Sequence, residues 1–219
     1  MNSVYRICNN KRLGVYYIIC SIIYGICGTL ISIIIRIELY SSGNRIISIE
    51  NMNFYNINIT LHGIIMIFFL IMPGLFGGFG NYFIPIFQGS PEVVYPRINN
   101  FSIYILILSF LFLILSIIIE FGGGTGWTLY PPLSTSYISL SSSSIIYIIF
   151  TLLISGLSSY LTSINFLITF ILIKLYSLIL NIIILYSWSL FITSIILILI
   201  LPILSGTLIL IFSDIYSNN

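Results

Sequence analysis

His62 is the only histidine of this 219-residue chain, and it lies in an apolar segment that is long enough to cross a membrane. An ionisable side chain is costly to bury in hydrocarbon, so its presence there indicates a functional site. A neutral imidazole in apolar surroundings is a common ligand of haem iron, and Met66 shares its helix face. The alternative is an interfacial histidine that is hydrogen-bonded to a neighbouring helix. A bis-histidine haem would need its second axial ligand from another polypeptide.

Two glycines and several polar residues follow His62. Gly74 and Gly78 are four residues apart, a spacing that lets another helix or a flat macrocycle approach the backbone closely. The polar residues at the end of the segment and in the loop after it are Asn81, Glu92, Asn99 and Asn100. Such groups at a membrane surface could begin a proton path, and an ordinary solvated loop would have the same composition.

Two other patterns indicate no chemistry of their own. The run GGGTGW at 122–127 lacks the trailing G-K-[ST] of a phosphate-binding loop and the strand that precedes it. Cys8, Cys20 and Cys27 form no C-x-x-C pair, and the last two lie in an apolar run as small apolar side chains. We therefore expect neither nucleotide binding nor a disulfide or zinc framework.

The composition limits the class of protein. Hydrophobic residues make up 59% of the chain, and only seven basic and five acidic residues are present. In a soluble domain about a quarter of the residues are charged. A soluble globule, a nucleic-acid-binding protein and a disordered chain are therefore excluded. The net charge of +2 is too small to favour a polyanionic partner.

Apolar runs of about 20 residues predict membrane-spanning helices. We expect an all-α, polytopic bundle that forms one membrane domain over residues 1–219, with spans at about 14–35, 60–87, 101–119, 142–173 and 182–212. Pro73 and Pro85 predict a kink in the second span. The stretch 141–185 has room for one tilted helix or two short ones, so six spans are the alternative.

With five spans, the basic residues divide unequally between the two sides of the membrane. One side carries Arg6, Lys11, Arg12, Arg97 and Lys174, and the other carries Arg36 and Arg45. Because basic residues concentrate in cytoplasmic-type loops, this division places the N-terminus inside and the C-terminus outside. Glu92 is then expected near the inner surface.

Four long sequence blocks between Thr60 and Ser134 carry a resemblance to a known family. They read TLHGIIMIFF, MPGLFGGFGNYFIP, PRINNFS and EFGGGTGWTLYPPLS. Together they resemble subunit I of the haem–copper oxygen reductases, of the mitochondrial cytochrome c oxidase type. Weaker similarity continues on both sides, from Lys11 to Asp214, so the resemblance covers nearly the whole chain.

The resemblance implies a low-spin haem site. His62 matches the second-helix histidine that is one axial ligand of haem a, and Arg36 with Ser32 matches positions near the haem formyl group. Tyr55 and Trp127 match further residues around that haem, with Met66 on the helix face of His62. Glu38 and Gly43 resemble part of a peripheral cation site.

The resemblance also implies the entrance of a proton channel, known in this family as the D channel. Glu92 stands where the family usually has an aspartate, so the carboxylate is kept and one methylene is added. Asn81 and Asn99 match asparagines just inside the entrance. Ser158, Ser159 and Asn165 match polar positions further in. Asn10 replaces a histidine that is usual before the first helix.

The family continues into a sixth helix where this sequence ends, just after Asp214. We therefore expect a twelve-helix subunit that is split between two polypeptides, with haem a3 and copper B on a C-terminal partner fragment. The implied setting is a proton-pumping oxidase of the mitochondrial inner membrane, with the N-terminus in the matrix. Its further partners would be subunits II and III and cytochrome c. This chain alone would not be active.

Two other functions are kept as alternatives. A quinol-oxidising relative would take its electrons from ubiquinol, and no residue of this chain distinguishes it from a cytochrome c oxidase. A non-catalytic helical scaffold or a small-solute transporter would be favoured if the family motifs were decayed remnants.

Overall fold

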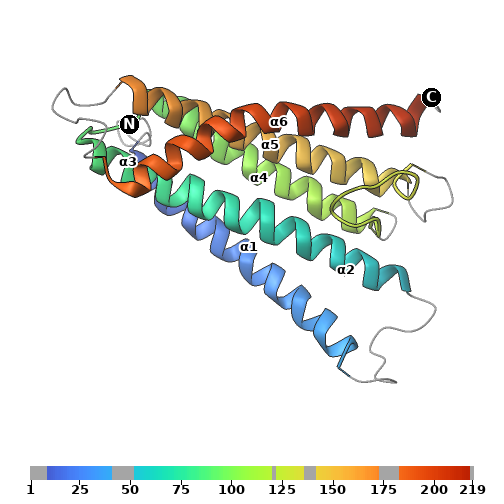
Figure 1. Ribbon diagram of the computed structural model, residues 1–219. Helices are drawn as coiled ribbons and strands as arrows, with labels where there is room; N and C mark the ends of the chain where they lie inside the picture. Colours follow the sequence, from blue (N-terminus) through green and yellow to red (C-terminus); the bar gives the residue numbers. More distant parts are fainter. Residues whose placement is uncertain (1–8, 41–51, 120–121, 136–141, 173–182, 218–219) are drawn as a thin grey trace, which may run out of the picture.

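The computed structural model describes residues 9–40, 52–119, 122–135, 142–172 and 183–217, and these ranges are helical apart from the connecting segments. Figure 1 shows long helices that run back and forth along one axis. The helical elements are α1 (Asn10–Glu38), α2 (Met52–Ile64), η3 (Ile65–Phe79), α3 (Gly80–Gln88), α4 (Pro96–Ile118), α5 (Ser142–Leu172) and α6 (Leu185–Ser217).

Five helical segments are long and apolar enough to cross a membrane, which confirms the expected all-α, five-span fold class. The second of these segments is continuous through α2, η3 and α3, from Asn53 to Gln88. Within the stretch 141–185, residues 142–172 form one helix, and residues 173–182 lie outside the described ranges. In the part of the chain described here, no β-strand occurs.

The first helix is longer than the apolar run that predicted it. It begins at Asn10 because the side chain of Asn9 accepts a hydrogen bond from the backbone N–H of Lys11, at 3.1 Å, and so caps the helix. It continues through Arg36 to Glu38, beyond the predicted end at residue 35. Charged residues at the ends of a spanning helix are compatible with its continuation, because their side chains reach the interface.

The middle of the second segment is a π-helix. Pro73, where we expected a kink, lies inside the fifteen-residue element η3, and Pro85 lies inside α3. Proline removes a backbone donor and crowds the preceding turn of an α-helix. A wider helical turn is one way to accommodate that change.

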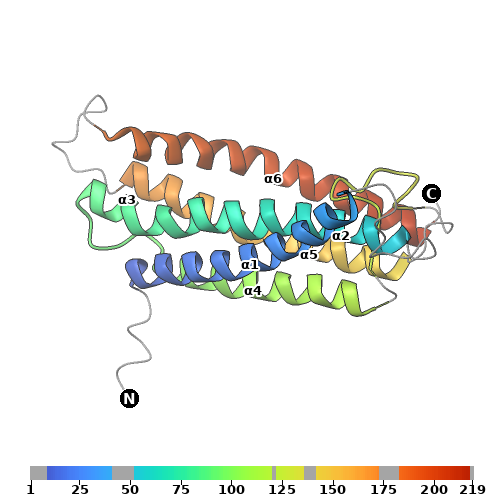
Figure 2. The same cartoon turned by 90° about the horizontal axis from the view of Figure 1, so that it is seen from below.

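Glycines let α1 and η3 approach each other closely. A Cβ atom added at Gly77 would lie 2.8 Å from Cδ1 of Tyr17, and one added at Gly78 would lie 2.6 Å from Cγ1 of Ile18. Neither contact leaves room for a side chain at the glycine position. The predicted close approach at Gly74 and Gly78 is therefore made by another helix of this same chain, which Figure 2 shows alongside the second segment.

The two ends of the bundle are each named after one residue. The starts of α1 and α4, together with α3, lie at the left of Figure 1, and this is called the Glu92 end. The end of α1, the start of α2 and the loop 122–135 lie at the right, and this is called the Trp127 end. Lys11, Arg12 and Arg97 belong to the Glu92 end, and Arg36 belongs to the Trp127 end.

Candidate functional site

His62 is held by the backbone of the neighbouring helix. Its Nδ1 atom lies 3.0 Å from the carbonyl oxygen of Gly28, which is on α1. Because a carbonyl oxygen can only accept, a neutral ring must carry its proton on Nδ1, and Nε2 of that tautomer keeps a free lone pair. The imidazole is half-buried. The structure thus gives His62 both the interhelical hydrogen bond of a packing residue and the tautomer of a metal ligand.

Gly28 allows this hydrogen bond because it has no side chain. A Cβ atom at this position would lie 2.7 Å from the sulfur of Met66 and 3.2 Å from Cγ2 of Ile65. Met66 therefore lies next to the carbonyl group that holds His62, on the same side of the second segment. The two residues that we expected to share a helix face do so against α1.

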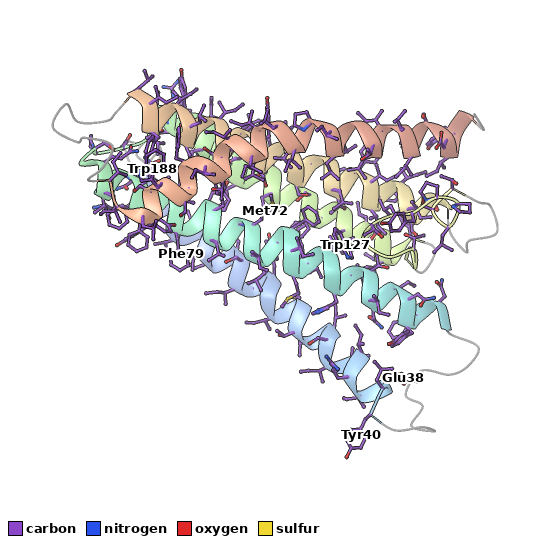
Figure 3. The ribbon with its side chains drawn as sticks, viewed as in Figure 1. Glu38, Tyr40, Met72, Phe79, Trp127 and Trp188 are labelled. Carbon is purple, nitrogen blue, oxygen red and sulfur yellow. The ribbon has the colours of Figure 1, made fainter. Side chains whose placement is uncertain are left out.

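The loop 122–135 brings Trp127 to the second segment. A Cβ atom added at Gly63, the residue after His62, would lie 2.9 Å from Cδ1 of Trp127. The Trp127 ring centroid is 6.5 Å from that of Phe68, and 44% of Trp127 is exposed. Figure 3 shows Trp127 between the loop and this segment. The run GGGTGW therefore serves as a tight loop that packs on helices.

The other expected haem-site residues lie toward the Trp127 end of the bundle. Arg36 is exposed, Tyr55 is half-buried, and the hydroxyl of Ser32 donates to the carbonyl of Thr29 at 2.7 Å. Of the expected cation site, Glu38 is half-buried at the end of α1, and Gly43 lies outside the described residues.

Three buried asparagines meet at the Glu92 end, and they are called the asparagine cluster. They are Asn10, Asn81 and Asn99, each at most 1% exposed. The Asn99 amide nitrogen donates to Oδ1 of Asn81 at 2.6 Å and to Oδ1 of Asn10 at 3.4 Å. Asn81 donates in turn to the carbonyl of Gly77. The structure therefore brings together Asn81 and Asn99, as expected, and adds Asn10.

Four buried hydroxyl residues continue from this cluster and are called the hydroxyl cluster: Tyr17, Ser102, Ser158 and Thr162. Ser102 donates to the carbonyl of Asn99 at 2.7 Å, which links the two clusters. Tyr17 Oη is 2.6 Å from Ser102 Oγ, and Ser158 donates to the carbonyl of Ser102 at 2.6 Å.

A small cavity lies beside the hydroxyl cluster. Its volume is about 10 Å³, close to what one water molecule needs, and its lining includes Tyr17, Ser158 and Thr162 together with Ser159. Ser159 donates to the carbonyl of Ser155 at 3.2 Å and lies 3.5 Å from the sulfur of Met72. Ser158 and Ser159, two of the three polar positions expected on α5, thus face one small cavity.

Glu92 is exposed in the loop between α3 and α4, and Asn165 holds that loop. The backbone N–H of Tyr95 donates to Asn165 Oδ1 at 3.1 Å, and Asn165 Nδ2 donates to the Tyr95 carbonyl at 3.2 Å. Thr169 accepts from the N–H of Val94 at 3.2 Å. The structure does not bring Asn165 into the asparagine cluster. Asn165 instead anchors the loop that carries Glu92 to α5.

Sequence reasoning did not identify the Gly28 carbonyl, Tyr17 or Ser102 as site groups. A backbone carbonyl leaves no trace in residue type, so Gly28 could be noticed only as a small residue in a helix. Tyr17 had a signal, because the buried residues of α1 recur every three or four positions from Asn10 to Gly28 and include it. Within the described residues, no group of three histidine, cysteine or acidic side chains converges as metal ligands.

Comparison with known proteins gives one consistent result. The family model described as cytochrome c and quinol oxidase polypeptide I matches residues 12–218. The chain is 54% identical over 211 residues to cytochrome c oxidase subunit 1 of Plasmodium falciparum and of Plasmodium chabaudi, and 53% identical to that of Plasmodium berghei. These alignments cover 96% of this chain and 44% of each relative, so the chain spans less than half the length of the curated relatives it matches.

The match to the family model extends over nearly the whole sequence, including the His62 segment, Asn81 and Asn99 of the asparagine cluster, and the glycine-rich loop. The matched segment contains four of the five candidate membrane spans in full and the first from residue 12 onward. This multi-pass membrane protein belongs to the cytochrome c and quinol oxidase polypeptide I family, whose members are haem–copper oxidases.

Proposed function

We propose that this chain is the N-terminal part of subunit I of a cytochrome c oxidase, in which His62 binds the low-spin haem a. The complete complex would reduce oxygen to water and move protons outward. The observation that carries the proposal is the 3.0 Å contact between His62 Nδ1 and the Gly28 carbonyl. Histidine ligands of metals usually donate their second ring N–H to a carbonyl or carboxylate, which orients the ring and makes the ligating nitrogen more basic.

The residues around His62 fit a haem. The imidazole is half-buried, so its ring is neither sealed in the core nor surrounded by water. Gly28, Ser32 and Arg36 follow each other at four-residue intervals on α1, which places them along one face of that helix. Polar groups on this stripe could then bind the edge of the macrocycle, with Arg36 donating to the formyl group. When bound, the haem supplies one-electron transfer, and His62 would not contact oxygen.

Proton entry from the Glu92 end is the second part of the proposal. Glu92 is exposed where a carboxylate can exchange protons with water, and its loop is fixed to α5 by Asn165. The asparagine cluster and then the hydroxyl cluster extend from this end toward the cavity beside Ser158. Hydroxyl side chains beside a cavity with room for one water molecule support a proton path, because a hydroxyl can both donate and accept.

The oxygen-reducing centre would lie on the helices that follow this segment in its relatives, which are more than twice as long. Haem a3, copper B and the second axial ligand of haem a would be held there. The exposure of α6 is evidence that further helices pack against it, because only 11% of its most apolar stretch is buried, against 44% for α5. Open apolar grooves of about 430 and 460 Å³ also run along α6.

The proposed setting is the mitochondrial inner membrane, with the N-terminus in the matrix and with subunits II and III and cytochrome c as partners. Lys11, Arg12 and Arg97 at the Glu92 end outnumber Arg36 at the other described end, which supports this orientation. The relatives with about 54% identity are cytochrome c oxidases, which favours cytochrome c over a quinol as the electron donor.

The experiment that tests this function is His62→Ala in the assembled complex, followed by visible spectroscopy of the purified protein. We expect loss of the low-spin haem band, because the iron loses an axial ligand. Leu61→Ala is the control, since it creates a cavity at a buried neighbouring position without removing a ligand. A His62→Ala complex that keeps the low-spin band and its oxidase activity would refute the assignment.

A further inference from the structure

The hydroxyl group of Thr60 joins α2 to the glycine-rich loop. Its Oγ1 atom donates to the carbonyl of Asn56 in the preceding turn, at 2.9 Å, and accepts from the backbone N–H of Gly126, also at 2.9 Å. Thr60 is fully buried. A hydroxyl that donates within its own helix and accepts from another segment fixes the distance between the two. Valine at this position would have nearly the same shape and neither hydrogen bond.

The bond is made at a point of the loop where the backbone is left-handed. Gly126 has φ +83°, a conformation that side chains with a Cβ rarely adopt, and Trp127 follows it directly. The rest of the loop is fixed by packing, because Gly122 lies against Ile57 of α2 and Gly123 lies against Ile148 of α5. The Thr60 hydrogen bond therefore holds the part of the loop that carries the indole of Trp127.

The indole lies against the residue next to His62. Gly63 has no room for a Cβ because Cδ1 of Trp127 would be 2.9 Å away, and Thr60 is less than one helical turn before Gly63. With 44% of its surface exposed, Trp127 is free to contact a group that binds at His62. Figure 3 shows that Trp127 reaches the second segment from the loop rather than from a spanning helix. Its position thus depends on what holds the loop.

We propose that Thr60 is a positioning residue of the haem site, which acts through the Gly126 N–H to fix the indole of Trp127 beside the haem held by His62. This inference rests on the proposed haem function and goes beyond it. Thr60 itself contacts no cofactor. Its hydroxyl determines where an aromatic side chain lies relative to the haem, and so influences the electronic environment of that haem.

The test replaces Thr60 in the assembled complex and measures the absorption maximum and midpoint potential of the low-spin haem. Thr60→Val should shift both while the haem content stays at the wild-type level, and Thr60→Ser should restore them because it keeps the hydroxyl. Thr151→Val is the matched control. Thr151 is equally buried and donates to the carbonyl of Tyr147 four residues earlier at 2.8 Å, so its hydrogen bond stays within α5. It should leave both values unchanged.

A double-mutant cycle tests whether the effect passes through the indole. Trp127→Phe alone should shift the low-spin haem, and adding Thr60→Val to it should produce no further shift, because the two changes act on one contact. Additive shifts would overturn the proposal. So would a Thr60→Val complex with wild-type absorption and potential. If Thr60→Val and Thr60→Ala both fail to assemble while Thr151→Val assembles, the hydroxyl is required for folding and the positioning role is refuted.

These outcomes separate this inference from the proposed function. If His62→Ala retains the low-spin haem, the function itself is wrong, whatever the Thr60 variants do. If His62→Ala loses that haem and Thr60→Val leaves its spectrum and potential unchanged, the haem site stands and the role of Thr60 is wrong.

Discussion

At the Trp127 end of the bundle one imidazole is held by a single backbone carbonyl, whereas at the Glu92 end uncharged side chains hold one another. His62 contacts Gly28 across a helix interface that glycine makes narrow. The asparagine and hydroxyl clusters instead form a chain of contacts among α1, the second segment, α4 and α5. The Trp127 end depends on one close approach between two helices. At the Glu92 end, the hydrogen bonds are distributed over many side chains.

The difference determines how each region responds to change. A group with one partner loses its orientation when that partner moves. A network with several donors and acceptors loses only part of its bonds, since the remaining groups keep theirs, although a buried group left without a partner still has an energetic cost. We therefore expect substitutions at the Trp127 end to act on the haem and substitutions at the Glu92 end to act on stability or proton flow.

Gly28→Val should have the largest effect. The added side chain would overlap the sulfur of Met66, which is 2.7 Å from the Cβ position, and would crowd Cγ2 of Ile65 at 3.2 Å, so both α1 and the Met66 side chain must shift. Overpacking of this kind costs about 1–3 kcal/mol or more. The Gly28 carbonyl would then leave His62, and we expect loss of the low-spin haem band in the purified complex together with reduced assembly.

The control for this variant is Gly206→Val, because a Cβ atom added at Gly206 on α6 meets no atom of another described helix within 4 Å. In the complex that assembles, the low-spin haem band should be normal, because the added side chain does not touch the contact between α1 and His62. A normal spectrum in Gly28→Val itself would mean that the carbonyl contact does not orient His62, and the contrast between the two ends would lose its basis.

Asn99→Leu should have an intermediate effect, which acts on stability and on proton flow and leaves the haem unchanged. It leaves Asn81 Oδ1 and Asn10 Oδ1 buried without their donor, at a cost of about 1–2 kcal/mol. Thermal unfolding of the detergent-solubilised complex should show a lower midpoint with an unchanged haem spectrum. Asn100→Leu, at the adjacent half-buried position, serves as the matched substitution and should change the midpoint less. Equal midpoints for both variants would argue against a cooperative asparagine cluster.

Glu92→Gln should have the smallest effect on the structure. Glu92 is exposed, and glutamine keeps its size, so stability and both haem signals should stay as in the wild type. Only the ability to release and take up protons is lost, and proton pumping measured in vesicles should fall. Unchanged pumping would show that protons enter elsewhere and that the Glu92 end has no role in their uptake.

The helices could be predicted because hydrocarbon length and apolar composition determine them. The five spans follow from runs of about 20 apolar residues, and the cap at Asn9 and the charged end at Glu38 explain why α1 exceeds its apolar run. The pairing of Gly74 and Gly78 with a close neighbour also followed from spacing. The spacing did not identify the neighbouring helix, because a small residue permits a close approach without specifying a partner.

The candidate site was predictable in its side chains and not in its contacts. His62 stood out as a lone ionisable group in an apolar run, and Asn81 and Asn99 as polar groups near a surface. Every residue type has a backbone carbonyl, so the sequence could not indicate that the carbonyl of Gly28 contacts His62. Asn165 was placed on the proton path by resemblance, yet its hydrogen bonds hold the backbone of Tyr95. Only the structure distinguishes an amide on a proton path from an amide that holds the backbone of a loop.

The two clusters at the Glu92 end have an electrical consequence. All of their side chains are neutral at physiological pH, from Asn10 and Asn81 to Tyr17 and Ser158. A membrane potential does work of about 2.3 kcal/mol on each elementary charge that crosses 100 mV, and it does no such work on a neutral group. A transferred proton would therefore experience the voltage while the side chains that conduct it would not. Changes in membrane potential should alter the driving force along this path and leave the arrangement of the path unchanged.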